Sequence, residues 1–475
     1  MSYNNIIQEG QLVAKWQNDE QRRAIATVYI DYYRNVYREI LFDLLEKQIT
    51  DNVECARIKQ YVESEGVVEW LINEIALVFA KEPIIKPLNA TGKVLSNEKT
   101  VESFETFLED LNINVVLENI DQYVELLRDV AVIPIVYNKK LTLKIITPEK
   151  AIVIQDENDP TQMVAFLYQI GITEDSVGVN NAVDQYMCYD MRSGTLDSYK
   201  CKLYDNGEID PASKIPVKTP AYTDIPVIMF RNYLPDDSFW YKGNSGIVDK
   251  SIAIDMRRTD LAMAEAYHIP HLVTTGLDEK AWRNLSVART AYWNIPNDAN
   301  GESGDAKFIT PKDDLDKLKE LINDRRKVIA RNKGLSSDTI DGVTATSGYQ
   351  LALSKQDILN INQRKRKYYT NPIRKLILLA IETAKYYNII NLTSVKNIHI
   401  NYGELTFAQS DEEKARARAM DTQAGIWSPV QSLMADDPEL TEEMAVKKVK
   451  QIEEWNKLVK PANPFEKPQE EEPSV

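Results

Sequence analysis

Cysteine is scarce in this sequence, with only three among 475 residues. Cys55, Cys188 and Cys201 are widely spaced and form no Cys-x-x-Cys pair. A disulfide framework or a structural zinc site needs paired or clustered thiols, so neither is expected. We instead expect a reducing cytoplasm, in which the thiols serve as small apolar groups.

Histidine is equally rare, and the chain again contains three. His268 and His271 flank Pro270, which breaks the helical register that would aim both imidazoles at one metal ion. The third is His399. We therefore predict structural histidines, no metal site and no cofactor.

Enzyme signatures and membrane segments are also missing. The sequence has no Gly-x-x-x-x-Gly-Lys phosphate loop, no His-Glu-x-x-His and no nucleophile elbow. Acidic clusters on predicted helices are typical of solvated faces, so no catalytic dyad is assigned and no enzyme is expected. No apolar run approaches the roughly 18 residues that span a bilayer. The first residues, Met1–Asn5, lack the basic and apolar regions of a signal peptide.

Basic charge is in deficit. The chain has 72 acidic and 57 basic side chains, a net charge of −15 and a pI near 5.0. A protein that grips DNA nonspecifically needs basic surface to displace counterions, so this balance argues against such a protein. Two interpretations stay open: the acidic charge serves solubility, or it forms a conduit wall that repels phosphates and lets DNA slide.

The chain begins with long helical patterns. Apolar residues recur at helical spacing over 10–48, Val67–Ala80 and Thr100–Asp129, which predicts three helices. Pro83 prevents the second helix from continuing, and Asn89–Gly92 is a turn. A chain of this length buries a large core and is expected to form two or more subdomains.

From Ala131 the pattern changes to short segments of β-branched and aromatic residues, separated by polar turns. We predict strands over 132–137, 141–146, 151–155, 163–172, 186–189, 199–204 and 225–232. Together they predict one antiparallel β subdomain over 131–235, packed on the N-terminal helices.

Two long helices of matched length follow. The first opens near Asn244 and ends before Pro270; at about 22 residues it is roughly 33 Å long. The second runs from Lys312 to Lys333, and Gly334 is placed to end it. Strand-like pieces lie between the helices, at 272–275, 290–293 and 307–309. An antiparallel helix pair with a cap at one end is predicted.

A polar segment, 336–347, joins the second of these helices to a longer one. Its Gly, Thr, Ser and Asp residues cannot build a core, so it should face solvent or a partner. Spacing alone favours an ordinary helix connection. In the long helix that follows, Pro372 is expected to cause a kink near Tyr368. A strand is predicted over 397–402.

Gly334-Leu335-Ser336, followed by Gly342 to Leu353, resembles the segment in portal proteins of tailed double-stranded DNA bacteriophages that joins the second stem helix to the long kinked wing helix. Ile225–Asn232 resembles the last β segment before the portal stem. Lys81–Ile84 resembles a helix-then-Pro-Ile step near the start of such proteins. The order of the motifs matches over residues 65–458.

The resemblance implies a mainly helical α+β fold with the portal architecture of wing, stem, clip, long kinked helix and crown, assembled as a ring. In the family's usual form the ring has twelve subunits. The implied divisions are an N-terminal helical wing part (1–130), an antiparallel β wing part (131–240), a first stem helix (241–269), a clip (270–311), a second stem helix (312–334), a tunnel loop (335–348), a long kinked wing helix and following strand (349–403), a helical crown (404–459) and a disordered tail (460–475).

The function implied by the resemblance is a channel at one capsid vertex for DNA packaging, retention and ejection. Its partners would be further copies of the chain, the terminase large subunit, the major capsid and scaffolding proteins, a head–tail adaptor, and double-stranded DNA bound without sequence specificity. No membrane is implied. The location would be the virion, and the host cytoplasm during assembly.

The resemblance also assigns residues. The tunnel loop would line the narrowest part of the channel with Asp338, Thr339, Asp341, Val343, Thr344 and Thr346. The clip would dock the terminase and later the connector through Trp293, Asn297, Asp298, Asn300 and Glu302.

The strongest charged cluster is Arg364, Lys365, Arg366 and Lys367, just before the expected kink. Three interpretations compete. The default is a solvated basic face. The one we favour is a subunit interface that pairs with acids of a neighbouring copy, because a ring of acidic chains needs complementary patches. Contact with DNA phosphates comes third, since four bases supply little affinity.

Two rival functions remain. A packaging nuclease or ATPase would need a phosphate loop or clustered metal-binding acids in a basic cleft, and neither is visible. Another ring-forming head–tail connector or neck protein is also possible, although such chains are usually much shorter.

Overall fold

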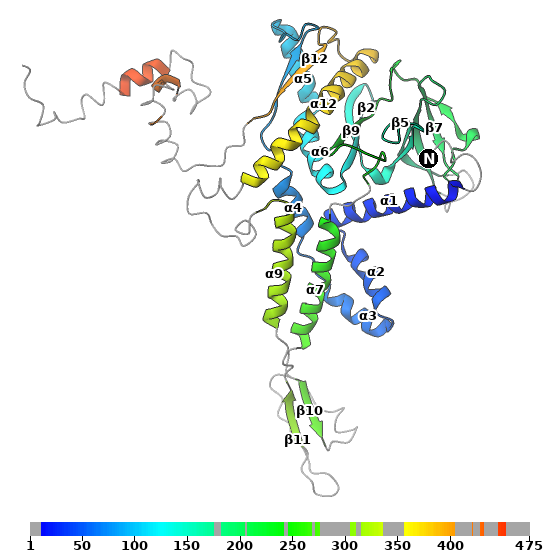
Figure 1. Cartoon of the computed structure of the whole chain (residues 1–475), viewed down its shortest axis with the longest axis vertical. Coiled ribbons are helices and arrows are strands. Elements are labelled where there is room, and N and C mark those ends of the chain that lie inside the picture. The colour runs from blue at the N-terminus through cyan, green and yellow to red at the C-terminus, as the bar shows by residue number, and fades with distance from the viewer. Residues whose placement is uncertain are drawn as a thin grey trace, which may run out of the picture. The chain divides into compact units, whose positions relative to one another are not determined.

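The computed structural model describes most of the chain up to residue 403 and short pieces beyond it. The described ranges are 11–174, 182–204, 207–241, 246–267, 271–275, 305–309, 315–335, 356–403, 420, 428–431 and 445–452. The chain divides into two compact units, one built from 1–343 with 355–405 and the other from 344–354 with 406–475. The elements named below belong to the first unit (Figure 1). Helix and sheet are mixed, as the predicted α+β class requires.

The N-terminal region is helical. Its elements are α1 (Gln11–Tyr33), α2 (Arg38–Gln48), α3 (Asn52–Ile58), the short helix η2 (Lys59–Tyr61) and α4 (Val67–Ile75). The single helix predicted over 10–48 is wrong, because the chain breaks between α1 and α2. Asn35 adopts a left-handed backbone there, with φ of 60°, and its amide donates to Glu69 at 2.7 Å. A left-handed residue cannot continue a right-handed helix.

Two further corrections concern helix ends. The helix predicted to reach Ala80 ends at Ile75, and the backbone N–H of Val78 instead donates to buried Asp121 at 3.0 Å. The helix predicted over Thr100–Asp129 is two helices, α5 (Glu98–Asp110) and α6 (Ile113–Leu127). They separate at Asn112, which is also left-handed. Each break sits at a residue type that tolerates that conformation.

The β region is antiparallel, as predicted, but it forms two sheets rather than one. The smaller has the order β3-β2-β9 and the larger β4-β5-β6-β7-β8. Their strands are β2 (Asp129–Tyr137), β3 (Lys140–Ile146), β4 (Ala151–Gln155), β5 (Met163–Glu174), β6 (Ala182–Asp190), β7 (Asp197–Lys202), β8 (Ile215–Pro216) and β9 (Ile228–Arg231), with short helices η3 (Pro148–Lys150) and η4 (Pro211–Ser213) between them. The turn from β2 to β3 uses Asn138 and Lys139, both at positive φ, as tight hairpins require.

Strand β2 is buried on both faces because helices cover one face and the larger sheet covers the other. Val130 and Val132 pack into a core with α5, α6 and the long helix α12 (Gln356–Tyr386). Ala131 and Ile133 point the other way and pack against the larger sheet. The alternation of side chains along a strand therefore joins two cores.

Helix α12 runs through Pro372 and contributes a buried stripe to the first core. The strand predicted at 397–402 is confirmed as β12 (Asn397–Asn401). It pairs antiparallel with β1 (Ile84–Leu88), which the sequence did not predict.

The two long helices predicted downstream are confirmed as α7 (Ile247–Tyr267) and α9 (Leu315–Asn332). They lie side by side and antiparallel, and Glu265 near the end of α7 pairs with Lys319 near the start of α9 (Figure 1). Between them in the sequence, β10 (His271–Thr275) and β11 (Asp305–Ile309) form an antiparallel hairpin. Helices α7 and α9 share a second core with α1 to α4.

Candidate functional site: the paired helices and the buried charges beside them

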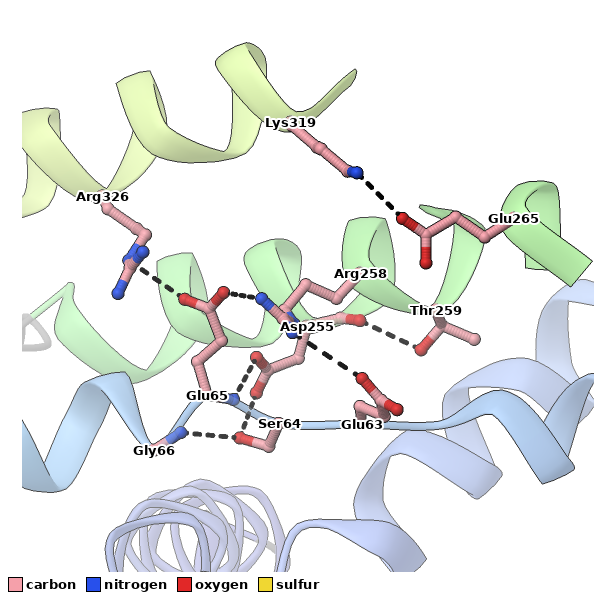
Figure 2. A network of polar contacts seen from close by, with 10 residues as sticks. All are labelled: Glu63, Ser64, Glu65, Gly66, Asp255, Arg258, Thr259, Glu265, Lys319 and Arg326. Carbon is pink, nitrogen blue, oxygen red and sulfur yellow. Dashed lines mark hydrogen bonds and ion pairs between the residues drawn. The ribbon is translucent and has the colours of Figure 1, made fainter. Parts of the chain in front are cut away.

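Glu65 is the polar anchor of the paired helices (Figure 2). Its carboxylate pairs with Arg258 of α7 and, at 3.0 Å from Nε, with Arg326 of α9. The Glu65 side chain is 10% exposed, whereas the two arginines are about one third exposed. One carboxylate, carried by the segment just before α4, therefore holds both helices to the N-terminal region.

Asp255 forms a second anchor beside the first. It lies on α7, is only 1% exposed, and accepts hydrogen bonds from the hydroxyls of Tyr32 and Ser64, the latter at 2.6 Å. Burial raises the pKa of Asp255, and these hydrogen bonds only partly oppose that rise. The pKa of Tyr32 is raised as well, first by burial and then by the neighbouring carboxylate. Asp255 therefore fixes α7 to α1 through Tyr32, and both anchors fix α7 to the chain before α4.

The C-terminal end of α9 is closed in the way the sequence predicts. Gly334 adopts φ of 77°, its N–H donates to the carbonyl of Arg331, and the N–H of Leu335 donates to Ala330 at 3.0 Å. This is the Schellman pattern, and buried Leu335 supplies the apolar contact that accompanies it. The direction in which the chain leaves α9 is therefore fixed at Leu335.

A buried charge network lies between α6 and α12. Lys365 of α12 is 4% exposed, and its Nζ lies 3.0 Å from Glu125 Oε1 and 3.6 Å from Asp121 Oδ1. It also donates to the carbonyl of Ile75, at the end of α4, at 2.9 Å. Tyr369, one turn further along α12, donates to Asp121 at 2.9 Å. The network joins three helices.

The pKa shifts in this network follow from burial and proximity. Burial would lower the pKa of Lys365, but Asp121 and Glu125 raise it above its ordinary value. Burial alone would raise the pKa of Glu125, yet Lys365 and then Arg128 lower it. The pKa of Asp121 is raised by burial in spite of Lys365. The network therefore favours the charged forms of Lys365 and Glu125, whereas burial disfavours the charged form of Asp121.

A cavity of about 350 Å³ opens next to this network. Its wall combines the end of α9, the end of α6 and the first turns of α12. The lining residues are Ile75, Glu125, Arg128, Asn232, Asn332, Lys333, Ile361, Arg364, Lys365 and Tyr368. Four of them are cationic and one is an acid, which contrasts with the acidic balance of the whole chain.

The basic cluster predicted as a subunit interface divides in the structure. The prediction is wrong for Lys365, because helical periodicity turns this side chain inward and its charge is neutralised within the chain. Arg366 is half-buried; it donates to the carbonyl of Gly403 at 2.9 Å and lies over Tyr402. Arg364 and Lys367 are exposed. For these two, contact with a neighbouring copy stays a prediction.

The other predicted site residues lie outside the described residues. These are the tunnel-loop residues Asp338, Thr339, Asp341, Val343, Thr344 and Thr346, and the clip residues Trp293, Asn297, Asp298, Asn300 and Glu302. The structure does describe the elements that adjoin both segments. The loop follows Leu335 and precedes α12, and the clip residues lie between β10 and β11.

The three cysteines are buried free thiols. Burial raises the pKa of Cys188 to about 12 and that of Cys201 to about 11. Among the residues that the structure describes, no group of three or more His, Cys, Asp or Glu side chains is placed to hold a metal ion. Within the same ranges, no helix has the length and apolar character needed to cross a bilayer.

Comparison with known proteins gives likeness at the level of structure only. No family model and no curated protein matches the sequence. Among solved structures, a chain from the virion of a native gene transfer agent particle is similar with 12% identity and a TM-score of 0.44, over 78% of this chain and 90% of that one. A chain from the neck of an empty gene transfer agent particle is similar with 12% identity and a TM-score of 0.43, over 76% and 87%.

Proposed function

We propose that this chain is a portal protein, which assembles as a ring around a DNA channel at one vertex of a phage-type capsid. The observation that carries the proposal is the sequence of elements from α7 to α12. Two paired antiparallel helices are joined through a β-hairpin, and a polar segment then leads into a long helix. That order is the one expected from the resemblance of residues 334–353 to the portal stem and tunnel loop.

The described contacts suit such a role for the paired helices. A stalk that carries load must not shift against the body of its own subunit. Glu65 and Asp255 supply that restraint, because each connects α7 to residues near the start of the chain. Lys365 does the same for α12 by bonding to both α4 and α6. In the sequence, the proposed channel loop thus connects two helices, α9 and α12, that are both fixed to the rest of the subunit.

The remaining parts of the proposal follow from this placement. Asp338, Asp341 and the neighbouring small residues would face the channel, where acidic charge repels DNA phosphates and prevents sticking. The clip between β10 and β11 would dock the terminase large subunit and then a head–tail adaptor. The chain would act in the virion, contact the capsid and scaffolding proteins, and perform no catalysis, since a partner motor supplies the energy.

Electron microscopy of the purified full-length protein tests the proposal directly. We expect closed rings with a central channel and a stalk, and twelve-fold class averages. Compact monomers that persist at high protein concentration would overturn the ring and with it the portal function.

Two deletions then separate channel from docking function. Removal of 338–345 should leave rings intact but impair DNA packaging or retention in a reaction with procapsids and the cognate terminase. Removal of 297–304 is the matched control, because this segment has the same length and belongs to the proposed clip. It should spare DNA retention and weaken terminase binding. Normal packaging by the first variant would contradict the channel assignment.

A further inference from the structure

The cavity beside the buried charge network has an excess of positive charge. Lys365 is neutralised by Glu125 and Asp121, and Glu125 also accepts a hydrogen bond from Asn232 at 2.9 Å. Arg128, Lys333 and Arg364 are different. Within the described ranges, none of these three has a carboxylate at ion-pair distance. The cavity therefore presents three cations that form no ion pair with the described residues, although Arg128 and Lys333 share the field of Glu125.

Arg128 is held in the cavity at a cost. It ends α6 with φ of 73°, a conformation that non-glycine residues rarely adopt. One terminal nitrogen donates to Asn232 at 3.2 Å, while its buried Nε has no hydrogen-bond partner among the described residues. The guanidinium also lies 5.7 Å from the centre of the Tyr241 ring, so protein contacts fix its position while its Nε donor stays unused.

Lys333 shows the same excess of charge. Burial, followed by repulsion from Arg128, lowers its pKa to about 8. The charged groups around it are Arg128 and Glu125 from α6, Lys365 and Arg364 from α12, and Lys250 from α7. Only one of these is an acid, and that acid is already paired with Lys365. An incoming anion would offset the repulsion from Arg128 and favour the charged amine of Lys333.

We propose that the cavity lined by Arg128, Lys333 and Arg364 receives a carboxylate side chain from a second copy of this chain. The inference rests on the proposed ring, which brings copies into contact. The size and lining of the cavity favour a protein side chain as the occupant. Its apolar walls, from Ile75 and Ile361, suit the methylene groups of an Asp or Glu side chain. A DNA phosphate fits less well, because a rigid duplex that reached exposed Arg364 could not also follow half-buried Arg128 and Lys333 into the recess.

The net acidic charge of the chain points to a second copy as the source of the carboxylate. Each copy carries 15 more acidic than basic side chains, so association of identical copies is opposed unless basic recesses receive acids. A subunit interface of this kind is heterologous: one face supplies the carboxylate and another supplies the cavity, as a ring requires. This proposal revises the subunit interface predicted from the sequence at 364–367. Arg364 stays in the proposed interface, whereas Lys365 does not, because it is buried within its own chain.

Zero-length cross-linking tests both the contact and its origin. A carbodiimide joins the amine of Lys333 to a carboxylate in direct contact with it. Rings are assembled from an equal mixture of ¹⁵N-labelled and unlabelled chains, and the cross-linked peptides are read by mass spectrometry. We expect Lys333 joined to an acidic peptide, with labelled–unlabelled pairs forming about half of the product. Cross-links confined to one chain, for example to Asp338 or Asp341, would overturn the proposal.

Assembly of variants gives an independent readout. Lys333→Met combined with Arg364→Gln should lower ring stability on dilution at least tenfold while the monomer stays folded by circular dichroism. Lys375→Met is the matched control, because Lys375 is an exposed lysine on α12, the helix that carries Arg364. This variant should assemble as the unmodified protein does. Lys333→Arg should keep the contact. In the unmodified protein, we expect each subunit contact to weaken by up to about tenfold between pH 7 and pH 9, because Lys333 loses its proton there. Lys333→Arg should abolish this pH dependence.

The outcomes distinguish this inference from the proposed function. If the unmodified protein forms no ring, the portal proposal fails first. If rings form and the Lys333→Met, Arg364→Gln protein assembles equally well, the portal proposal stands and the carboxylate pocket is refuted. If that variant assembles normally but loses retention of duplex DNA in a filter-binding assay, the pocket is a phosphate site and the inference is again wrong.

Discussion

Removal of Lys365 is the most informative single change in the described structure. Lys365→Met keeps most of the aliphatic stem but deletes the buried ammonium. Glu125 and Asp121 would then lose their nearest cation while staying buried, and the carbonyl of Ile75 would lose its donor. Breaking a buried ion pair from one side costs about 3–5 kcal/mol. We expect the free energy of unfolding to fall by that amount at pH 7.5.

The stability difference between Lys365→Met and the unmodified protein should also depend on pH, in a direction that the structure predicts. In the unmodified protein the pKa of Lys365 is raised, so its contribution is fully present below the unfolded pKa of a lysine and is lost only as the pH rises through the folded value. In Lys365→Met, both carboxyls would have folded pKa values above their unfolded ones. Groups of that kind stabilise at low pH and lose this effect as the pH rises. The deficit of the variant should therefore shrink between pH 7.5 and pH 5.

Urea unfolding followed by tryptophan fluorescence measures the change, with Lys375→Met as an exposed control on the same helix. The control should stay within about 0.5 kcal/mol of the unmodified protein, as surface substitutions do. Adding Glu125→Gln and Asp121→Asn to Lys365→Met removes the orphaned charges and should recover more than half of the loss. If Lys365→Met behaves like the control at every pH, the buried network does not hold the helices together and the reasoning is refuted.

Three other outcomes follow from the structure. Gly334→Ala places a side chain at φ of 77° and should lower the free energy of unfolding by about 1 kcal/mol, measured by urea titration. Glu65→Gln leaves two arginines without their shared carboxylate and should cost about 2 kcal/mol in the same assay. Cys55, Cys188 and Cys201 are buried, so a colorimetric thiol reagent at pH 8 should react slowly with the native protein and with three thiols after denaturation.

Features set by short stretches of sequence could be predicted. The end of α9 at Gly334 was predicted because a glycine after a run of basic residues is a local signal, and the observed hydrogen bonds confirm it. The polar turn between the strands predicted at 132–137 and 141–146, and the strand β12, were predicted from local composition for the same reason. Each of these depends on a few neighbouring residues and little on the rest of the fold.

Features set by distant residues could not be predicted. The pairing of β1 with β12 joins segments about 300 residues apart, and neither strand specifies its partner. The early end of α4 depends on Asp121, which takes the backbone N–H of Val78. The breaks at Asn35 and Asn112 interrupt patterns that remain apolar on both sides, so periodicity alone extends the helix through them.

The inward position of Lys365 did leave a signal in the sequence. Ile358, Asn362, Lys365 and Tyr369 recur at spacings of three and four, and all four are buried along one stripe of α12. A run of four basic residues drew attention to charge rather than to this register. The matching signal on α6 is a pair of acids four residues apart, Asp121 and Glu125, within an apolar helix. A lysine on one buried stripe and two acids on another together indicate an internal ion pair.

The position of Lys365 also explains how the proposed channel loop can be held. Helix α12 passes from one core to the other: Ile358 is buried with α1 to α4, whereas Tyr369 is buried with α5 and α6. Lys365 stands between these two residues and bonds to α4 on one side and α6 on the other. A force applied to the loop reaches the subunit through α9 and α12, because the loop is covalently tied to both. The helix α12 can slip along its axis only by separating Lys365 from Glu125, and a buried charge resists that separation more strongly than apolar packing, which can readjust by one turn. We therefore expect Lys365→Met to let α12 shift along its axis more readily than in the unmodified protein.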